Sequence, residues 1–184
     1  MSNNKALATV GKPKVGGAIH RAPVGTALPT TADGALDAAF KNVGYISEDG
    51  VEYDGSIESE EIKSWEQDVV MRPRTSRTDA FKFAMLEMLN TEALKVYYSD
   101  DNVTGTIETG IEVKVNADDA DPMSYVIDMI TTGGGLHRIV IPSGVVSETE
   151  SITYKPNEAA MLGVTVAASA DSDGNTHYEY FKGA

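Results

Sequence analysis

Three histidines are the first residues of this chain whose chemistry could serve a function. His20, His137 and His177 could bind a metal ion, but they are far apart in the sequence and none has a second ligand at helical or hairpin spacing. We therefore interpret them as ordinary strand residues. The chain has no cysteine, which excludes disulfides, zinc–thiolate sites and thiol catalysis.

Acidic and glycine-rich segments are the other candidates for chemistry. Asp171-Ser-Asp-Gly-Asn175 is similar to the start of a calcium loop, but Gly174 comes too early and no Glu stands at the twelfth position. The acidic residues of segment 118–121 could hold a cation loosely, although a solvated turn is the simpler interpretation. Gly133–Gly135 lacks the Lys-Ser/Thr partner of a phosphate loop. Because nucleophile and metalloprotease motifs are also missing, we expect neither an enzyme nor a cofactor.

The elements that would position such residues are mostly strands. Alternating or continuous apolar residues in eleven segments predict about nine or ten of them. The segments are Gly17–Ala22, Val43–Ile46, Val51–Tyr53, Val69–Met71, Phe81–Leu89, Gly110–Val115, Tyr125–Ile130, His137–Gly144, Ile152–Pro156, Met161–Ala167 and His177–Lys182.

Turn signals divide these strands. The Asp-Gly pairs of Glu48-Asp49-Gly50 and Asp173-Gly174 predict two β-hairpins. The Arg-rich segment Pro73–Thr78 is expected to link two strands. For Phe81–Leu89 a helix is an alternative on propensity, but its opening Phe-Lys-Phe alternation favours a strand.

One helix is expected over Thr91–Tyr98, with Thr91 as its cap and apolar residues at helical spacing. Asp37–Phe40 predicts a single helical turn. The fold class is therefore mainly β, a β-sandwich or barrel with one flanking α-helix, an extended N-terminal arm and long loops. We expect residues 1–184 to form one domain.

The net charge of −13 is unevenly distributed. Residues 1–24 carry four basic residues and no acidic one, whereas residues 25–67 carry ten acidic and two basic residues. A solvated surface is one interpretation of this pattern. The alternative is self-assembly, in which the basic arm of one copy lies against the acidic flank of the next.

Two segments lack a regular pattern. Residues 1–15 are predicted to form a flexible, extended arm, and residues 23–34 a long loop rich in Pro, Gly and Thr. Trp65 is expected to anchor a strand edge, with an interface role as the alternative. We find no signal-peptide core and no apolar run of membrane-spanning length, so we expect a soluble protein made in the cytoplasm, without membrane insertion.

A series of short motifs spans nearly the whole chain. They are Gly17-Ala-Ile, Ala22-Pro23-Val-Gly-Thr-Ala-Leu-Pro29-Thr, Gly44-Tyr-Ile-Ser-Glu-Asp-Gly50, Ile62-Lys-Ser-Trp65, Val69-Val-Met-Arg72, Phe81-Lys-Phe83, Glu92-Ala-Leu, His137-Arg-Ile-Val-Ile-Pro142-Ser-Gly and Tyr178-Glu-Tyr-Phe-Lys182. Their order and spacing together resemble the major tail tube proteins of long, non-contractile-tailed bacteriophages. The chain departs from that pattern at Met71, Met85 and Met88, where β-branched residues or threonine are expected.

The resemblance implies a structural virion protein, made in the host bacterial cytoplasm and located in the virion tail. Six copies would form a ring, and rings would stack head to tail into a tube that conducts phage DNA without sequence-specific binding. Partners implied are further copies of the chain and the tail tip, tape measure and tail terminator proteins. An all-β capsid or tail decoration protein, which forms no tube, is the alternative.

The resemblance also suggests where assembly contacts and the tube lumen lie. The candidates for acidic lumen residues, taken to occupy alternating strand positions, are Glu58, Glu60, Glu108 and Glu112. The candidates for contacts between subunits or rings are Lys5, Lys12, Lys14, Arg21, Pro23, Pro29, Glu48, Asp49 and Trp65.

Overall fold

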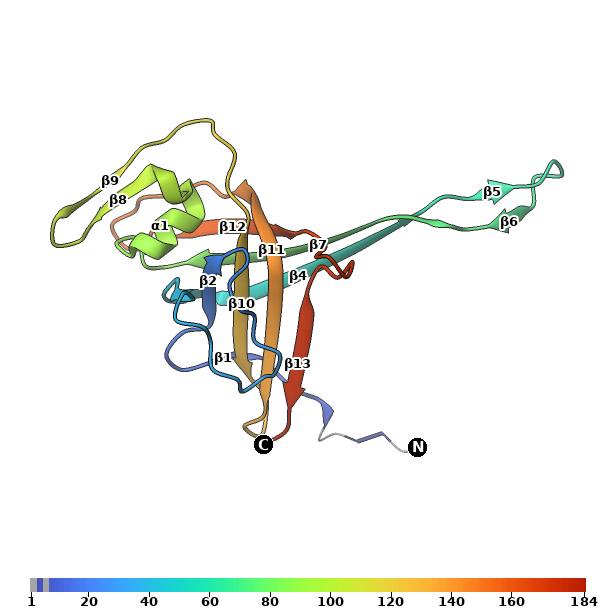
Figure 1. Cartoon of the computed structure of the whole chain (residues 1–184), viewed down its shortest axis with the longest axis horizontal. Helices are drawn as coiled ribbons and strands as arrows, with labels where there is room; N and C mark the ends of the chain where they lie inside the picture. Colours follow the sequence, from blue (N-terminus) through green and yellow to red (C-terminus); the bar gives the residue numbers. More distant parts are fainter. Residues whose placement is uncertain (1–2, 5–6) are drawn as a thin grey trace.

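A computed structural model describes residues 3–4 and 7–184 of the chain. Its main feature is one antiparallel sheet of nine strands, which follows the path β3-β2-β10-β11-β12-β7-β4, with β1 paired to β10 and β13 paired to β11 (Figure 1). The bounds are β1 Lys12–Pro13, β2 Ile19–Pro23, β3 Lys41–Asn42, β4 Ile46–Ser59, β7 Arg74–Met85, β10 Met123–Ile130, β11 Leu136–Thr149, β12 Leu162–Ala168 and β13 Tyr178–Lys182.

Smaller elements project from this sheet. Two hairpins are formed by β5 (Ile62–Lys63) with β6 (Val69–Met71) and by β8 (Val103–Thr106) with β9 (Gly110–Val113). The helix α1 covers Thr91–Tyr98, as predicted, and a 3-10 turn, η2, follows at Asp100–Asn102. The mainly β fold class with one flanking helix is confirmed.

The strand β11 holds the two parts of the sheet together. β10 pairs with one edge of β11. On the other edge, β13 pairs with residues 136–140 and β12 with residues 144–149. β12 and β13 therefore follow one another along β11 without pairing. In Figure 1, β10, β11 and β13 run across the direction of β12, β7 and β4, so the sheet folds over on itself.

The core fills the space inside this fold. Strand β10 is buried on both faces, so its alternate residues serve two apolar clusters. Tyr125 and Ile127 pack in the larger cluster with residues of β7, β11, β12 and α1. Val126 packs in a smaller cluster with Phe40, which belongs to the loop between β2 and β3. Each fully buried aliphatic or phenyl side chain contributes roughly 1.5–3 kcal/mol of transfer free energy.

The start of α1 corrects the predicted cap. The side chain of Asn90, not of Thr91, accepts a hydrogen bond from the backbone N–H of Glu92 at 2.9 Å. Asn90 has extended backbone angles, as an N-cap residue requires. The helix then buries Ala93, Leu94 and Val96 against the larger core cluster.

The first predicted hairpin is wrong. Glu48-Asp49-Gly50 lies within the single strand β4, which pairs with β7 along both sides of this segment. The register passes from Ile46 opposite Met85 to Val51 opposite Phe83, so β4 advances five residues while β7 advances two. The positive φ of Gly50 (75°) serves this bulge rather than a two-residue turn.

Other boundaries also differ from the prediction. Asp173-Gly174 makes the corner between β12 and β13, which are not a hairpin because both pair with β11. Most of the Arg-rich segment Pro73–Thr78 is the start of β7 instead of a link, and Phe81–Met85 is a strand, which excludes the helix. Ile152–Pro156 forms no strand beyond an isolated bridge from Lys155 to Glu158. Asp37–Phe40 forms a hydrogen-bonded turn rather than a helical one.

Candidate assembly surfaces

The N-terminal segment lies along the outer edge of β10. Lys12 and Pro13 form β1 opposite Ile130 and Met129. Farther back, Thr9 accepts a hydrogen bond at 2.8 Å from the backbone N–H of Thr132 in the turn after β10. This part of the predicted N-terminal segment (residues 1–15) is extended. Its flexibility before assembly stays a prediction.

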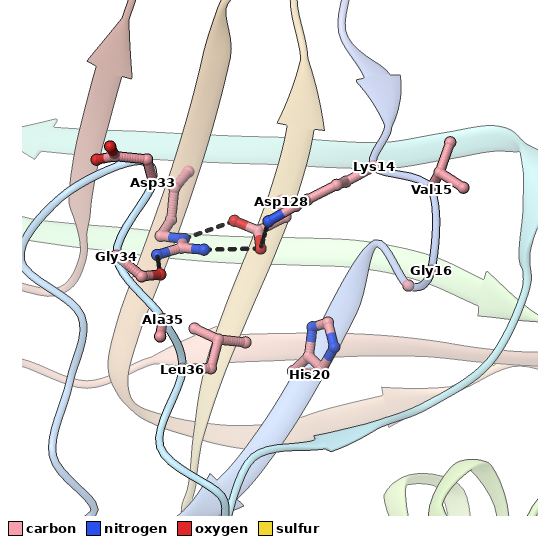
Figure 2. A pocket seen from close by; sticks show the side chains of 11 residues that line it. Lys14, Val15, Gly16, His20, Asp33, Gly34, Ala35, Leu36 and Asp128 are labelled. Carbon is pink, nitrogen blue, oxygen red and sulfur yellow. Dashed lines mark hydrogen bonds and ion pairs between the residues drawn. The ribbon is translucent and has the colours of Figure 1, made fainter.

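A buried ion pair fastens the segment and a loop to the sheet (Figure 2). Arg138 of β11, whose side chain is 1% exposed, donates from Nε and Nη2 to the two oxygens of Asp128 at 2.6 and 2.9 Å. Its Nη1 donates to the backbone oxygens of Thr31 and Gly34 at 3.0 and 2.7 Å. Lys14 adds a longer ion pair to Asp128 at 3.4 Å.

A cavity of about 240 Å³ lies beside this ion pair, and its lining includes Lys14, Gly34, Asp128 and Arg138. His20 points into it between the N-terminal segment and Leu36 (Figure 2). Its Nδ1 is buried and has no hydrogen-bond partner among the described residues. Burial lowers the pKa of His20, because a charged imidazole would be poorly solvated there.

A long β-ribbon, which we call the arm, extends from the sheet (Figure 1). It comprises residues 54–78, in which the outer parts of β4 and β7 pair with each other and β5 pairs with β6. Strand β12 pairs with β7 only from Asp79 onward, so the arm has no third strand beside it. The apolar side chains exposed along the arm are Ile57, Ile62, Trp65, Val69, Val70 and Met71.

Trp65 lies at the tip of the arm, in the turn between β5 and β6. The turn is closed by hydrogen bonds from Ser64 N–H to the Asp68 carbonyl and from Gln67 N–H to the Ser64 carbonyl. This geometry leaves Trp65 97% exposed. The expected strand-edge anchor is therefore wrong, while the alternative interface role stays a prediction.

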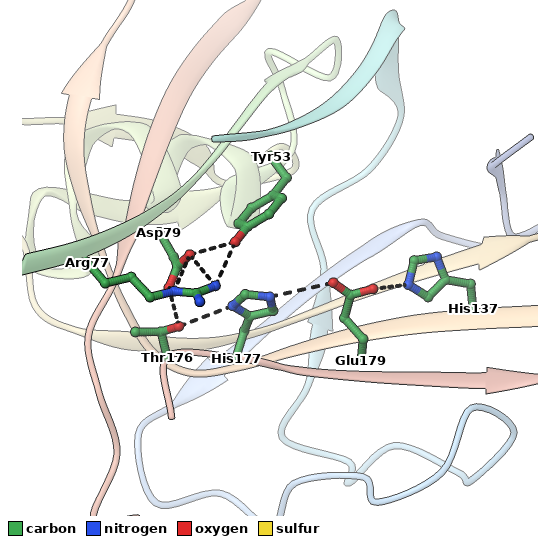
Figure 3. Close-up of polar contacts among 7 residues, drawn as sticks. All are labelled: Tyr53, Arg77, Asp79, His137, Thr176, His177 and Glu179. Carbon is green, nitrogen blue, oxygen red and sulfur yellow. Dashed lines mark hydrogen bonds and ion pairs between the residues drawn. The ribbon is translucent and has the colours of Figure 1, made fainter. Parts of the chain in front are cut away.

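The root of the arm is closed by a polar cluster around Asp79 (Figure 3). The Asp79 carboxylate has no exposed surface and accepts hydrogen bonds from Tyr53 Oη at 2.6 Å and Thr176 Oγ1 at 2.6 Å. Arg77 donates to it from Nε at 2.9 Å. Burial acts to raise the pKa of Asp79, but these hydrogen bonds and the Arg77 charge outweigh it and hold that pKa well below its ordinary value.

The Asp79 cluster thus joins the arm, with its exposed apolar side chains, to the rest of the sheet. The sequence model of the family described as "Phage tail tube protein" matches residues 3–182. The chain belongs to the phage tail tube protein family. Comparison with curated proteins finds no match.

This tail tube protein is also similar to a chain in a solved structure described as "Tail of empty GTA particle computed with helical refinement, C6 symmetry". The match covers 84% of this chain and 91% of that chain, with 10% sequence identity and a TM-score of 0.44. The family match makes this a structural tail component and does not favour the decoration alternative.

The tail tube protein brings only some of the predicted contact residues to its surface. Exposed candidates are Lys12, Pro23, Glu48, Asp49 and Trp65, and Lys14 is partly exposed. Arg21 is buried and pairs with Glu92 and Asp100 of the same chain, so it is not available to another subunit. Pro29 is also buried, and Lys5 lies outside the described residues.

The four candidate lumen residues lie on two separate projections. Glu58 is on the arm in β4 and accepts a hydrogen bond from Ser76, and Glu60 follows the end of that strand. Glu112 is on β9, while Glu108 lies in the turn before it and not at a strand position. The arm and the β8–β9 hairpin extend from opposite ends of the molecule (Figure 1), so a single subunit does not bring the two pairs together.

Sequence reasoning missed the two buried carboxylates. The signal for Asp128 and Arg138 was a single Asp or Arg inside each of the apolar segments Tyr125–Ile130 and His137–Gly144, which in a buried sheet indicates an ion pair. For Arg77 and Asp79 the signal was weaker, since their spacing of two only places them on one face of a strand. Among the described residues, no group of three or more His, Cys, Asp or Glu side chains is arranged so that it could hold a metal ion. Within the same residues, no helix is long and apolar enough to cross a membrane.

Proposed function

We propose that this tail tube protein assembles into six-subunit rings that stack head to tail, forming the tube through which phage DNA passes. The arm is the element that joins one subunit to the next. Stacking of this kind is a heterologous contact that does not close on itself, so it produces a filament. The tail tip, tape measure and terminator proteins would then define its ends and length.

The observation that carries this proposal is the exposed apolar surface of the arm. A two-stranded ribbon in isolation is marginally stable in water. The arm nevertheless exposes Trp65, Val70 and Met71 near its tip, each more than half accessible. A contiguous exposed apolar surface marks an interaction site, and an unpaired ribbon edge is a template for another chain. A second copy of the chain supplies the acceptor in every ring and between rings.

Electron microscopy of the purified protein over a range of concentrations tests this. We expect hollow tubes or stacked rings with six-fold end views. A Trp65→Ser variant should remain folded and form tubes only at higher concentration, whereas a Tyr154→Ser variant changes an exposed aromatic residue outside the arm and serves as the control. Wild-type protein that stays monomeric at all concentrations, even with tail tips added as nuclei, contradicts the proposal.

The charge supports an acidic bore. Six subunits of net charge −13 carry 6 × 13 = 78 negative charges. DNA binds basic surfaces through its phosphates, whereas an acidic wall repels them within a Debye length of about 8 Å. We propose that Glu58, Glu60, Glu108 and Glu112 contribute to that wall. For both pairs to face one bore, the arm of one subunit must reach the β8–β9 hairpin of another, which a tube reconstruction would test directly.

A further inference from the structure

The polar cluster at the root of the arm lies where the sheet changes from three strands to two. Asp79 is paired with Ala168, the last paired residue of β12, and with Gly55 of β4. Residues of β7 before Asp79 pair with β4 alone. Asp79 is thus the boundary between the braced body and the free-standing arm.

The cluster ties three chain segments together at that boundary. Tyr53 comes from β4, Arg77 and Asp79 from β7, and Thr176 from the connection between β12 and β13 (Figure 3). Arg77 Nη2 also donates to Tyr53 Oη at 3.1 Å, which closes the cluster across the arm. The segment of Thr176 does not pair with the arm, so these side chains supply a connection that the backbone ladder lacks.

Aromatic packing supports the same junction. The ring of His177 lies edge-on to both Tyr53 and Phe81, with centroid distances of 5.2 Å to each. Tyr53 and Phe81 are themselves stacked at 5.0 Å. Glu179, 3.6 Å from His177, in turn pairs with His137 at 2.8 Å and links the junction to β11.

Glycine at position 55 is required for the Tyr53 ring to lie across the arm. A Cβ built on Gly55 would stand 2.5 Å from Tyr53 Oη and 2.9 Å from its Cζ. Any other residue at this position would displace the tyrosine from Asp79. The sequence of β4 is therefore matched to the cluster, not only to the strand.

We propose that the Asp79 cluster is a latch that fixes the direction of the arm in the free subunit, so that the arm meets a second copy of the chain already oriented. The first half of this proposal, the fixed direction of the arm in the free subunit, stands without the proposed assembly. The second half, the orientation of the arm toward a second copy, rests on it. Without the latch, only its two strands and the aromatic packing at its root hold the ribbon, which can then bend there. Binding would then include the loss of that freedom, which lowers affinity without changing any contact at the tip.

Distance measurements on the monomer test the first half. The chain has no cysteine, so Lys63→Cys near the arm tip and Lys41→Cys on β3 allow clean double spin labelling. Pulsed electron paramagnetic resonance should give a narrow distance distribution in the otherwise wild-type chain. Tyr53→Phe, Thr176→Val and Asp79→Asn should each broaden it. Ser76→Ala, which removes a hydrogen bond within the arm itself, should not.

Tube formation tests the second half. We expect the concentration needed for tubes to rise about tenfold for Asp79→Asn, a loss of order 1.4 kcal/mol per contact. Tyr53→Phe and Thr176→Val are near-isosteric and keep the test valid if Asp79→Asn folds poorly. A distribution that stays narrow in all three variants overturns the latch. A broadened distance distribution together with unchanged tube formation overturns the role of the latch in assembly. A wild-type chain that forms no tubes refutes the proposed function, and the distance measurements on the monomer still test the latch.

Discussion

Arg138 and Asp128 lie opposite each other on β11 and β10, and the two side chains are almost fully buried. Removing one member leaves the other charge without compensation in the interior. We therefore expect Arg138→Met to reduce the free energy of unfolding by about 3–5 kcal/mol. Urea denaturation followed by circular dichroism measures this loss.

The matched control at the residue scale is an exposed pair. Lys155 and Glu158 are 2.7 Å apart, but both side chains are more than half exposed. Lys155→Met should change stability by less than about 1 kcal/mol. Equal effects of the two substitutions would show that the Arg138 pair does not hold the loop and the N-terminal segment to the sheet.

His20 gives a pH dependence at the same scale. Its pKa is lowered by burial, so the unfolded chain takes up a proton at a higher pH than the folded chain does. The contribution of His20 to stability is therefore complete above its ordinary pKa of about 6.5 and is lost as the pH falls below it. Wild type should lose stability between pH 7.5 and 5.5 relative to His20→Gln. The same pH slope in both proteins would contradict this.

At the scale of elements, the predicted bounds of α1 are correct, whereas its predicted N-cap residue is wrong. The apolar spacing predicted its bounds, but the cap is Asn90, one residue earlier than expected. Asn90→Ala should therefore destabilise the protein by about 1 kcal/mol, and Asn90→Asp by much less. Thermal unfolding measures both. Thr91→Ala is the direct comparison, and a larger loss there than at Asn90 would restore the original assignment.

The sequence predicts an element correctly where the pattern of apolar residues within that element is sufficient. Strand β10 and helix α1 follow from their own residues. The signal of Asp49-Gly50 failed because positive φ at glycine serves a bulge as readily as a hairpin turn, and only pairing with β7 distinguishes them. The Asp79 cluster could not be predicted, since Thr176 is 97 positions away and its approach depends on the course of β12 and β13 along β11.

At the scale of the whole molecule, body and arm should be separable. Ser56 and Thr78 face each other at the start of the arm. In a shortened subunit, Asn-Gly, a two-residue hairpin turn, replaces residues 57–77. This variant retains the Ser56–Thr78 pair and every member of the Asp79 cluster except Arg77. We expect a folded monomer with cooperative unfolding that forms no tubes at any concentration, as observed by electron microscopy.

A body that unfolds without cooperativity would show that the arm is needed for folding, and normal tubes would show that it is not needed for assembly. Addition of the shortened subunit to wild type distinguishes an arm that connects successive rings from an arm that connects subunits within one ring. If arms connect successive rings, the shortened subunit should add to a growing end and stop further growth. Tube length, measured in micrographs, should then fall with the fraction of shortened subunit.

The pairing of β2 with β10 also affects how the subunit is made. These strands are separated by on the order of 100 residues, so the sheet closes only after most of the chain has left the ribosome. Folding dominated by such distant pairings takes milliseconds to seconds. The arm pairs residues close in sequence and can form earlier. During synthesis, a nascent chain thus presents its apolar ribbon before its body exists, and chaperone binding in that interval should raise the yield of soluble subunit.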